Sequence, residues 1–211
     1  MNYVKMLGLL ALAAVAAMAF AAGMASATVL CSTNTKTVCG AAWQYPANTE
    51  IEASMTESAT FSSASEVVMT CSEGTLKVKT ENAGSGTETV RAKVSLWSWG
   101  SCSGTTDTSA LGEVEFHHIE GSATNGTVTS KKTTIKMTLF GSSCLYTTGE
   151  GVDLGTLTRS TEPMPGTIIP PVIDVSTTLA KSEGGLLCPS FLGLSAKYTV
   201  TSPKTLSTKT S

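Results

Sequence analysis

Two adjacent histidines, His117 and His118, are the side chains best suited to acid–base chemistry or metal binding in this chain of 211 residues, which has no other histidine. The residues around them alternate as in a β-strand, where neighbouring side chains point to opposite faces. Two neighbouring histidines on a strand therefore cannot bind one metal ion together, and no HExxH-type motif supplies further ligands. The sequence predicts no metal ion and no cofactor. It places His117 on the face of Glu115 and His118 on the face of Phe116, at the edge of the core opposite Thr133.

A serine hydrolase would need a nucleophile, a general base and a carboxylate that orients the base. Serines are plentiful, but the sequence contains no G-x-S-x-G motif. Its three aspartates, Asp107, Asp153 and Asp174, follow no order typical of a hydrolase family. Because a triad is a spatial arrangement, a secreted hydrolase remains the third functional hypothesis. A serine or glutamate within about 3 Å of either histidine, inside a pocket, would support it.

Trp97 and Trp99 could form a binding platform. At positions i and i+2 of a strand they share one face, and that face also carries Arg91 and Lys93, which we expect to meet solvent. Two exposed indoles side by side would stack on sugar rings or on an apolar partner. A β-bulge before the tryptophans, or a covering loop, would instead place them in the interior. The alternatives are therefore a carbohydrate-binding module and a pair of core residues.

Six cysteines indicate disulfide bonds, because an even number in an exported chain is typical of a disulfide framework. Zinc sites need closely spaced cysteine pairs or a nearby histidine, and the spacing here provides neither. We expect sequential pairing: Cys31–Cys39, Cys71–Cys102 and Cys144–Cys188. The second pair lies at positions of different parity, so an irregularity near Glu73-Gly74 or at Gly100 must intervene.

A hairpin is predicted from residues 75–80 and 89–99, joined through Gly84-Ser85-Gly86. Apolar residues of both strands should face the core, namely Leu76, Val78, Val90, Ala92, Val94 and Leu96. Charged residues should face solvent, namely Lys77, Lys79, Arg91 and Lys93.

A second hairpin is predicted around Asn125-Gly126, because Asn-Gly is the preferred dipeptide of a type I′ turn. Its strands would cover residues 111–124 and 127–140. A two-residue loop makes opposing residue numbers add up to 251. This register pairs Val114 with Met137 and Phe116 with Ile135 on one face, and Glu115 with Lys136 on the other.

The rest of the sequence also reads as β-structure, because Thr, Val and Ile are frequent and Gly or Ser/Thr clusters recur between short alternating runs. Further strands are expected at 51–55, 66–70, 152–158, 172–180 and 194–201. The proline-rich segment 162–171 is expected to be a connecting loop. Nine or ten strands in residues 28–211 predict an all-β fold, a single disulfide-linked domain built as an antiparallel β-sandwich or jelly-roll-like body.

The apolar residues are unevenly distributed. The chain is 41% hydrophobic with a mean hydropathy of +0.15, but much of this comes from residues 1–27. Lys5, the apolar run that follows it and Ala25-Ser26-Ala27 predict a helical signal peptide cleaved after Ala27, and hence a secreted protein. A membrane anchor is the alternative. Removing Lys5 changes the formal net charge from −2 to −3, and the scattered basic residues exclude a typical nucleic-acid binder.

Several short strings carry a resemblance. They are ATVLC at 27–31, HHIEG at 117–121, NGTVTS at 125–130, CLY at 144–146, DLGTLT at 153–158, LCPS at 187–190 and YTVTSP at 198–203. Together they resemble a group of small exported, Thr/Ser-rich, six-cysteine proteins of soil actinobacteria whose function is uncharacterised. The resemblance implies export and one β domain, and it implies no activity.

The leading functional hypothesis is therefore an exported, non-enzymatic binding or cell-surface domain with no stable membrane anchor after cleavage. Its partner would be a glycan or another component of the cell envelope. A carbohydrate-binding module that uses Trp97 and Trp99 is the alternative.

Overall fold

The computed structural model describes residues 28–33, 38–64, 66–106, 111–119, 121, 126–164 and 167–209. The predicted signal peptide and its cleavage site, as well as Asp107 and Asn125, lie outside these residues. The strands are β1 (Val29–Cys31), β2 (Glu50–Ser63), β3 (Glu66–Thr80), β4 (Val90–Cys102), β5 (Thr105–Thr106), β6 (Leu111–His118), β7 (Gly126–Leu139), β8 (Ser142–Thr147), β9 (Val152–Thr158), β10 (Thr161–Met164), β11 (Thr167–Ile169), β12 (Val172–Glu183), β13 (Phe191–Ser202) and β14 (Ser207–Lys209). A short 3₁₀ helix covers Ala41–Trp43.

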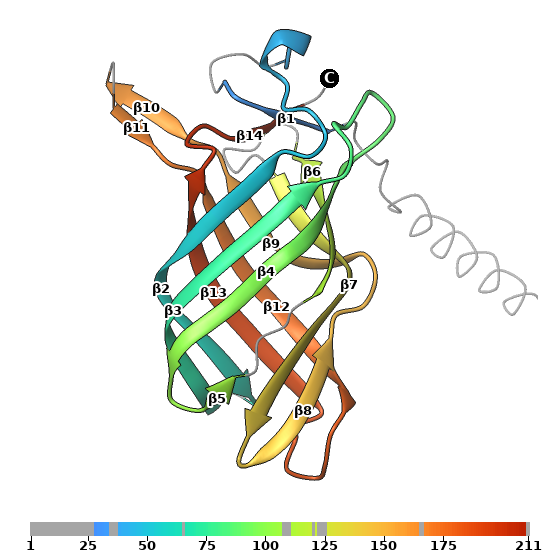
Figure 1. Ribbon diagram of the computed structural model, residues 1–211, viewed down its shortest axis with the longest axis vertical. Coiled ribbons are helices and arrows are strands. Elements are labelled where there is room, and N and C mark those ends of the chain that lie inside the picture. The colour runs from blue at the N-terminus through green and yellow to red at the C-terminus, as the bar shows by residue number, and fades with distance from the viewer. Residues whose placement is uncertain are drawn as a thin grey trace, which may run out of the picture.

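Ten of these strands form one antiparallel sheet that closes on itself (Figure 1). The first part of the sheet has the order β13-β2-β3-β4-β6-β7. The strands β8 and β9 each pair with β7 on one side and with β12 on the other. Strand β12 pairs with β13, which closes the sheet. Opposite halves of this closed sheet face each other across the core as two layers. The predicted all-β antiparallel sandwich is thus confirmed, with the addition that its layers are joined by hydrogen bonds at both edges.

The two ends of the closed sheet differ. At one end β1 pairs with β14, so the first and last strands form a small sheet that packs across the opening. Leu30 and Leu206 extend the core into this small sheet, since both are buried. At the other end the β7–β8 turn and the β12–β13 loop lie side by side (Figure 1). The short strands β1, β8 and β14 were not predicted from the sequence.

Apolar side chains at alternate positions of the strands point inward and fill the interior, as the sequence predicts. The largest fully buried side chains include Phe61, Phe116, Tyr146 and Tyr198. The predicted connecting loop 162–171 contains the hairpin of β10 and β11, which forms a two-stranded sheet apart from the closed one. It is not a central strand, as expected for a segment rich in proline.

The predicted register of the second hairpin is wrong. Strands β6 and β7 are neighbours, but Phe116 pairs with Val128 and His118 with Gly126, so opposing numbers add up to 244. His118 is consequently not opposite Thr133. Gly126 belongs to β7 rather than to a two-residue turn. A Cβ atom at Gly126 would lie 2.6 Å from the backbone oxygen of His117.

Two features explain the error: β6 ends at His118, so seven residues rather than two join it to β7, and β7 contains a bulge. Residues 126, 128 and 130 face inward, then Lys131 and Lys132 both point away from the core, and Thr133 and Ile135 face inward again. Lys132 has a positive φ of 65°. Beyond the bulge, residues 134–139 of β7 pair with β8. The predicted partners Ile135 and Met137 therefore face the core but lie opposite β8.

All three predicted disulfides are present: Cys31–Cys39, Cys71–Cys102 and Cys144–Cys188. Cys71 and Cys102 are direct cross-strand neighbours. The irregularity predicted near Glu73-Gly74 appears as a change in alternation, because Cys71 faces inward, Ser72 and Glu73 are both exposed and Leu76 faces inward again. Three disulfides fit an extracellular protein.

Candidate functional site

Trp97 and Trp99 are core residues, so the solvent-facing platform predicted from the sequence is wrong. Only 3% of Trp97 and 5% of Trp99 is exposed. The cause is a bulge in β4: Lys77 pairs with Leu96 and Val78 with Val94, which leaves Ser95 as an extra residue. Ser95 and Leu96 both point outward, and the following tryptophans point inward. This is the alternative in which a bulge turns the end of the strand, and it also corrects the expected inward position of Leu96.

The two indoles belong to an aromatic cluster that crosses the interior. Trp97 Nε1 donates a hydrogen bond of 2.9 Å to the hydroxyl of Tyr198. The rings of Trp97 and Trp99 are 5.1 Å apart, and Phe61 meets Trp99 edge to face at 5.4 Å. Burial raises the pKa of Tyr198 to about 12, so its hydroxyl is neutral near pH 7. The cluster stabilises the fold and offers no face to a ligand.

Next to this cluster the interior holds an apolar cavity of about 30 Å³. Its lining comes from six strands and consists of Leu76, Val78, Val94, Trp97, Val114, Phe116, Val128, Leu154, Gly155, Ile173 and Val175. The cavity has no polar group that could hold a water molecule. Engineered apolar cavities that bind benzene are about 150 Å³, so this one is too small for a sugar ring or an aromatic ligand.

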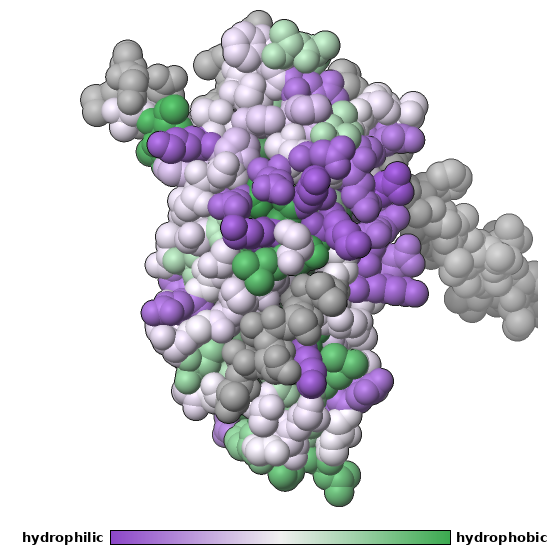
Figure 2. All heavy atoms as spheres, in the orientation of Figure 1, coloured by the Kyte–Doolittle hydropathy of each residue, from purple (hydrophilic) through white to green (hydrophobic). Residues whose placement is uncertain are grey.

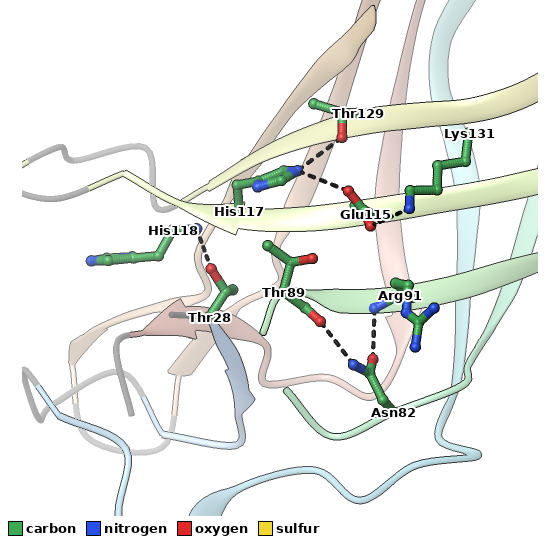
Figure 3. Close-up of polar contacts among 9 residues, drawn as sticks. All are labelled: Thr28, Asn82, Thr89, Arg91, Glu115, His117, His118, Thr129 and Lys131. Atoms are coloured by element: carbon green, nitrogen blue, oxygen red, sulfur yellow. Dashed lines mark hydrogen bonds and ion pairs between the residues drawn. The ribbon is translucent and has the colours of Figure 1, made fainter. Parts of the chain in front are cut away.

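The outer face of β6 and β7 carries the polar group closest to a catalytic constellation (Figure 3). His117 lies there on the face of Glu115, as predicted. Its Nε2 atom is 2.9 Å from Thr129 Oγ1 and 3.7 Å from Glu115 Oε2, and Glu115 Oε1 binds Lys131 Nζ at 3.0 Å.

This geometry does not form a catalytic relay. A triad needs one ring nitrogen on the nucleophile and the other on the carboxylate, whereas Thr129 and Glu115 both approach Nε2 of His117. Figure 3 shows His118 directed away from this group, and its backbone N–H donates a hydrogen bond to Thr28 Oγ1. The sequence-based placement of the two histidines on opposite faces is therefore confirmed, and they share no site.

Asp153 and Asp174 meet in a different place, an open hollow on the outside of β9, β12 and β13 that also includes Ser176 and Ser195. No histidine lines this hollow. Within the described part of the chain, no three His, Cys, Asp or Glu side chains are grouped closely enough to hold a metal ion. The same residues include no helix long and apolar enough to cross a membrane.

The most unusual surface lies at the end of the closed sheet opposite β1 and β14. Phe140, in the β7–β8 turn, is 67% exposed, and Leu186 and Leu187, in the β12–β13 loop, are 104% and 57% exposed. We call these three residues the apolar tip. Figure 2 shows apolar surface at the end where Figure 1 places the turn and the loop.

A disulfide holds the two parts of the apolar tip together. Cys144 of β8 is bonded to Cys188, which directly follows Leu187. Glu183 pairs with Leu145, so the loop starts alongside β8. Sequence reasoning missed the tip because it reads Phe140 as the end of a strand. The sequence does contain a sign of the tip: two leucines follow Gly184-Gly185 and directly precede a disulfide cysteine. Apolar residues beside glycines in a loop belong to no strand that could bury them, so this pattern indicates exposed leucines.

Comparison with known proteins finds no protein family, no curated protein and no solved structure that matches this chain.

Proposed function

We propose that this chain is an exported, non-enzymatic binding domain that contacts its partner through the apolar tip. The observation that carries the proposal is the exposure of Phe140, Leu186 and Leu187 in two loops held by a disulfide. Exposed apolar residues gathered in one place mark interaction sites, whereas single ones are common on any surface. The cell surface or the extracellular medium is the proposed location.

Export is supported by the cysteines and by the first residues of the chain. All six cysteines form disulfides, and such bonds persist in oxidising compartments. Residues 1–27 have the composition of a signal peptide. The resemblance to exported actinobacterial proteins points to the same location.

Binding is favoured over catalysis by what the described side chains do. The tryptophans pack inside, both neighbours of His117 approach one ring nitrogen, and the hollow at Asp153 has no histidine in its lining. Of these features the tip is the one that exposes large apolar side chains to solvent, which is why we propose it as the contact surface.

Export is tested by expressing the full chain in a bacterium that secretes proteins. We expect a protein that starts at Thr28 and has no free thiol without reduction. Retention of residues 1–27, or six reactive thiols, would contradict the proposal.

The contact surface is tested with Leu186→Ser/Leu187→Ser and a matched control, Ile168→Ser/Ile169→Ser. The control residues are 44% and 50% exposed in β11, at the opposite end of the molecule. We expect the tip variant to move from the cell-envelope fraction into the medium and the control to distribute like the wild type. An unchanged distribution of the tip variant would contradict a binding role for the tip.

A further inference from the structure

We infer that the partner of the apolar tip is a lipid bilayer, into whose interface Phe140, Leu186 and Leu187 insert. This inference rests on the proposed function and names the chemistry of its partner. The protein would attach to the membrane surface peripherally and reversibly, through these loops.

The shape of the tip favours a fluid partner. Its three side chains project from a turn and a loop at the end of the closed sheet, so they form a protrusion rather than a groove. A folded protein partner would need a complementary cavity, whereas acyl chains and headgroups adapt to any protruding apolar side chain. The Cys144–Cys188 bond fixes the loop to β8, so insertion requires little additional ordering of the chain.

The residues immediately beside the three tip side chains are small and neutral. Gly141, Ser142 and Ser143 follow Phe140, and Gly184 and Gly185 precede Leu186. Two charged side chains stand at the base of the loop. Lys181 donates a 3.1 Å hydrogen bond from Nζ to the backbone oxygen of Cys188, and Glu183 is exposed directly before Gly184. Strongly hydrophilic side chains gather farther along the outer face in Figure 2. Insertion of the three tip side chains would therefore bury apolar and small neutral groups, while Lys181 and Glu183 stay at the level of the lipid headgroups.

A second copy of the chain fits the tip less well than a bilayer does. Three large apolar side chains expose together roughly 400 Å². A stable protein interface needs about 800 Å² on each partner, and the small neutral residues beside the tip add no charged pairs to fix an orientation. An area of this size suffices for an interfacial anchor, because anchoring strength follows the apolar area buried.

The absence of a basic cluster beside the tip sets the lipid preference. Electrostatic attraction to anionic lipid requires clustered Lys or Arg near the surface, and the described loop residues of the tip include none. The chain without residues 1–27 has a net charge of −3, since Lys5 is lost from a total of −2. Binding should therefore be at least as strong to zwitterionic as to anionic vesicles and insensitive to salt.

The test uses residues 28–211, which contain every strand of the closed sheet and all six cysteines. Sedimentation with phosphatidylcholine vesicles measures the partition coefficient in 0.1 M and 1 M salt. We expect partition of the wild type at both salt concentrations. Leu186→Ser/Leu187→Ser should reduce it by roughly tenfold or more, and the Ile168→Ser/Ile169→Ser control should leave it unchanged. Thermal unfolding confirms that both variants are folded.

A second variant reports insertion directly. Phe140→Trp keeps an aromatic ring at the tip, and its fluorescence should shift to the blue and be quenched by brominated acyl chains when vesicles are added. The native tryptophans should show no such quenching, because none of them lies at the tip. Absence of wild-type partition, an equal loss in both serine variants or an unquenched Trp at position 140 would overturn the inference.

Failure of this inference is distinguishable from failure of the proposed function. If phosphatidylcholine vesicles do not bind the wild type but the tip variant is still released from the cell envelope, the tip binds a partner that is not lipid. If the tip variant stays in the envelope fraction, the tip has no binding role. A concentration-dependent dimer in sedimentation velocity that the tip variant abolishes would identify a second copy as the occupant and overturn the lipid inference.

Discussion

Trp97 on β4 donates a 2.9 Å hydrogen bond from its indole nitrogen to the hydroxyl of Tyr198 on β13, 101 positions later in the sequence. The two strands are not neighbours in the closed sheet, so the bond spans the interior. Tyr198 is fully buried and Trp97 nearly so. This bond joins the two layers through side chains, in addition to the strand pairing at their edges.

Tyr198→Phe should destabilise the protein by about 1–3 kcal/mol, because it leaves the buried N–H of Trp97 without this acceptor. Urea unfolding measures the difference. Tyr45→Phe is the matched control: its hydroxyl donates a 2.8 Å bond to the backbone oxygen of Thr205, but the residue is only partly buried. Equal losses of unfolding free energy in the two variants would contradict the expectation that losing the buried Tyr198 hydroxyl costs more than losing a partly buried one.

Stability should also fall at alkaline pH through Tyr198. Its folded-state pKa is about 12, against an ordinary value of 10.0, and the main cause is burial. The folded state thus favours the neutral phenol, a contribution that is complete below pH 10 and lost as the pH rises through 12. The loss amounts to roughly 2–3 kcal/mol.

Urea unfolding from pH 8 to 12 checks this, with Tyr198→Phe as the comparison. Burial also raises the pKa of Tyr146, which is present in both proteins, so only the difference between them reports on Tyr198. Parallel pH curves for the wild type and the variant would exclude the effect.

Gly126→Ala should destabilise the pairing of β7 with its neighbours. The new Cβ would lie 2.6 Å from the backbone oxygen of His117 on β6 and 2.7 Å from Thr208 Oγ1 on β14, so the β6 backbone and the Thr208 side chain must both move, at a cost of about 1–3 kcal/mol. Gly185→Ala is the control, because a Cβ there meets nothing within 4 Å. Thermal unfolding distinguishes the two, and faster amide exchange in β6 and β14 should accompany only the first.

The three disulfides should contribute unequally. Their cysteines are separated by 8, 31 and 44 positions, and the chain-entropy model gives roughly 2.5, 3.7 and 4 kcal/mol for loops of these lengths. Replacing both cysteines of a pair by serine should therefore cost least for Cys31–Cys39. Urea midpoints of the three double variants provide the test, and a larger loss for the first pair than for the others would contradict the ranking.

Local alternation was sufficient to predict the class of fold and most strands, because inward and outward positions repeat over short stretches. The three disulfides followed from the even number of cysteines and their sequential pairing. Bulges limited the rest. In β4 the extra Ser95 moves Trp97 and Trp99 inward, and in β7 two outward lysines shift the register with β6. The alternation resumes after each bulge, so a wrong register still brings apolar residues together.

The second hairpin shows why this error was difficult to detect. Asn-Gly suits a tight turn, but Gly126 is a glycine because Thr208 approaches it closely, and Thr208 belongs to a strand of three residues near the end of the chain. The candidate site escaped sequence reasoning for a related reason. Exposure of Leu186 and Leu187 depends on where the Cys144–Cys188 bond holds the loop, which no periodicity encodes.

The closure of the sheet has a consequence for the order of folding events during the export that we propose. Glu52 on β2 pairs with Ser202 on β13, and Val29 pairs with Lys209. β2 can pair with β3 early, but β1 and the second edge of β2 find their partners only when the last strands have arrived. Contacts so distant in sequence form late in folding. In the proposed export from the N-terminus, β2 therefore keeps one unpaired edge until β13 emerges on the far side of the membrane.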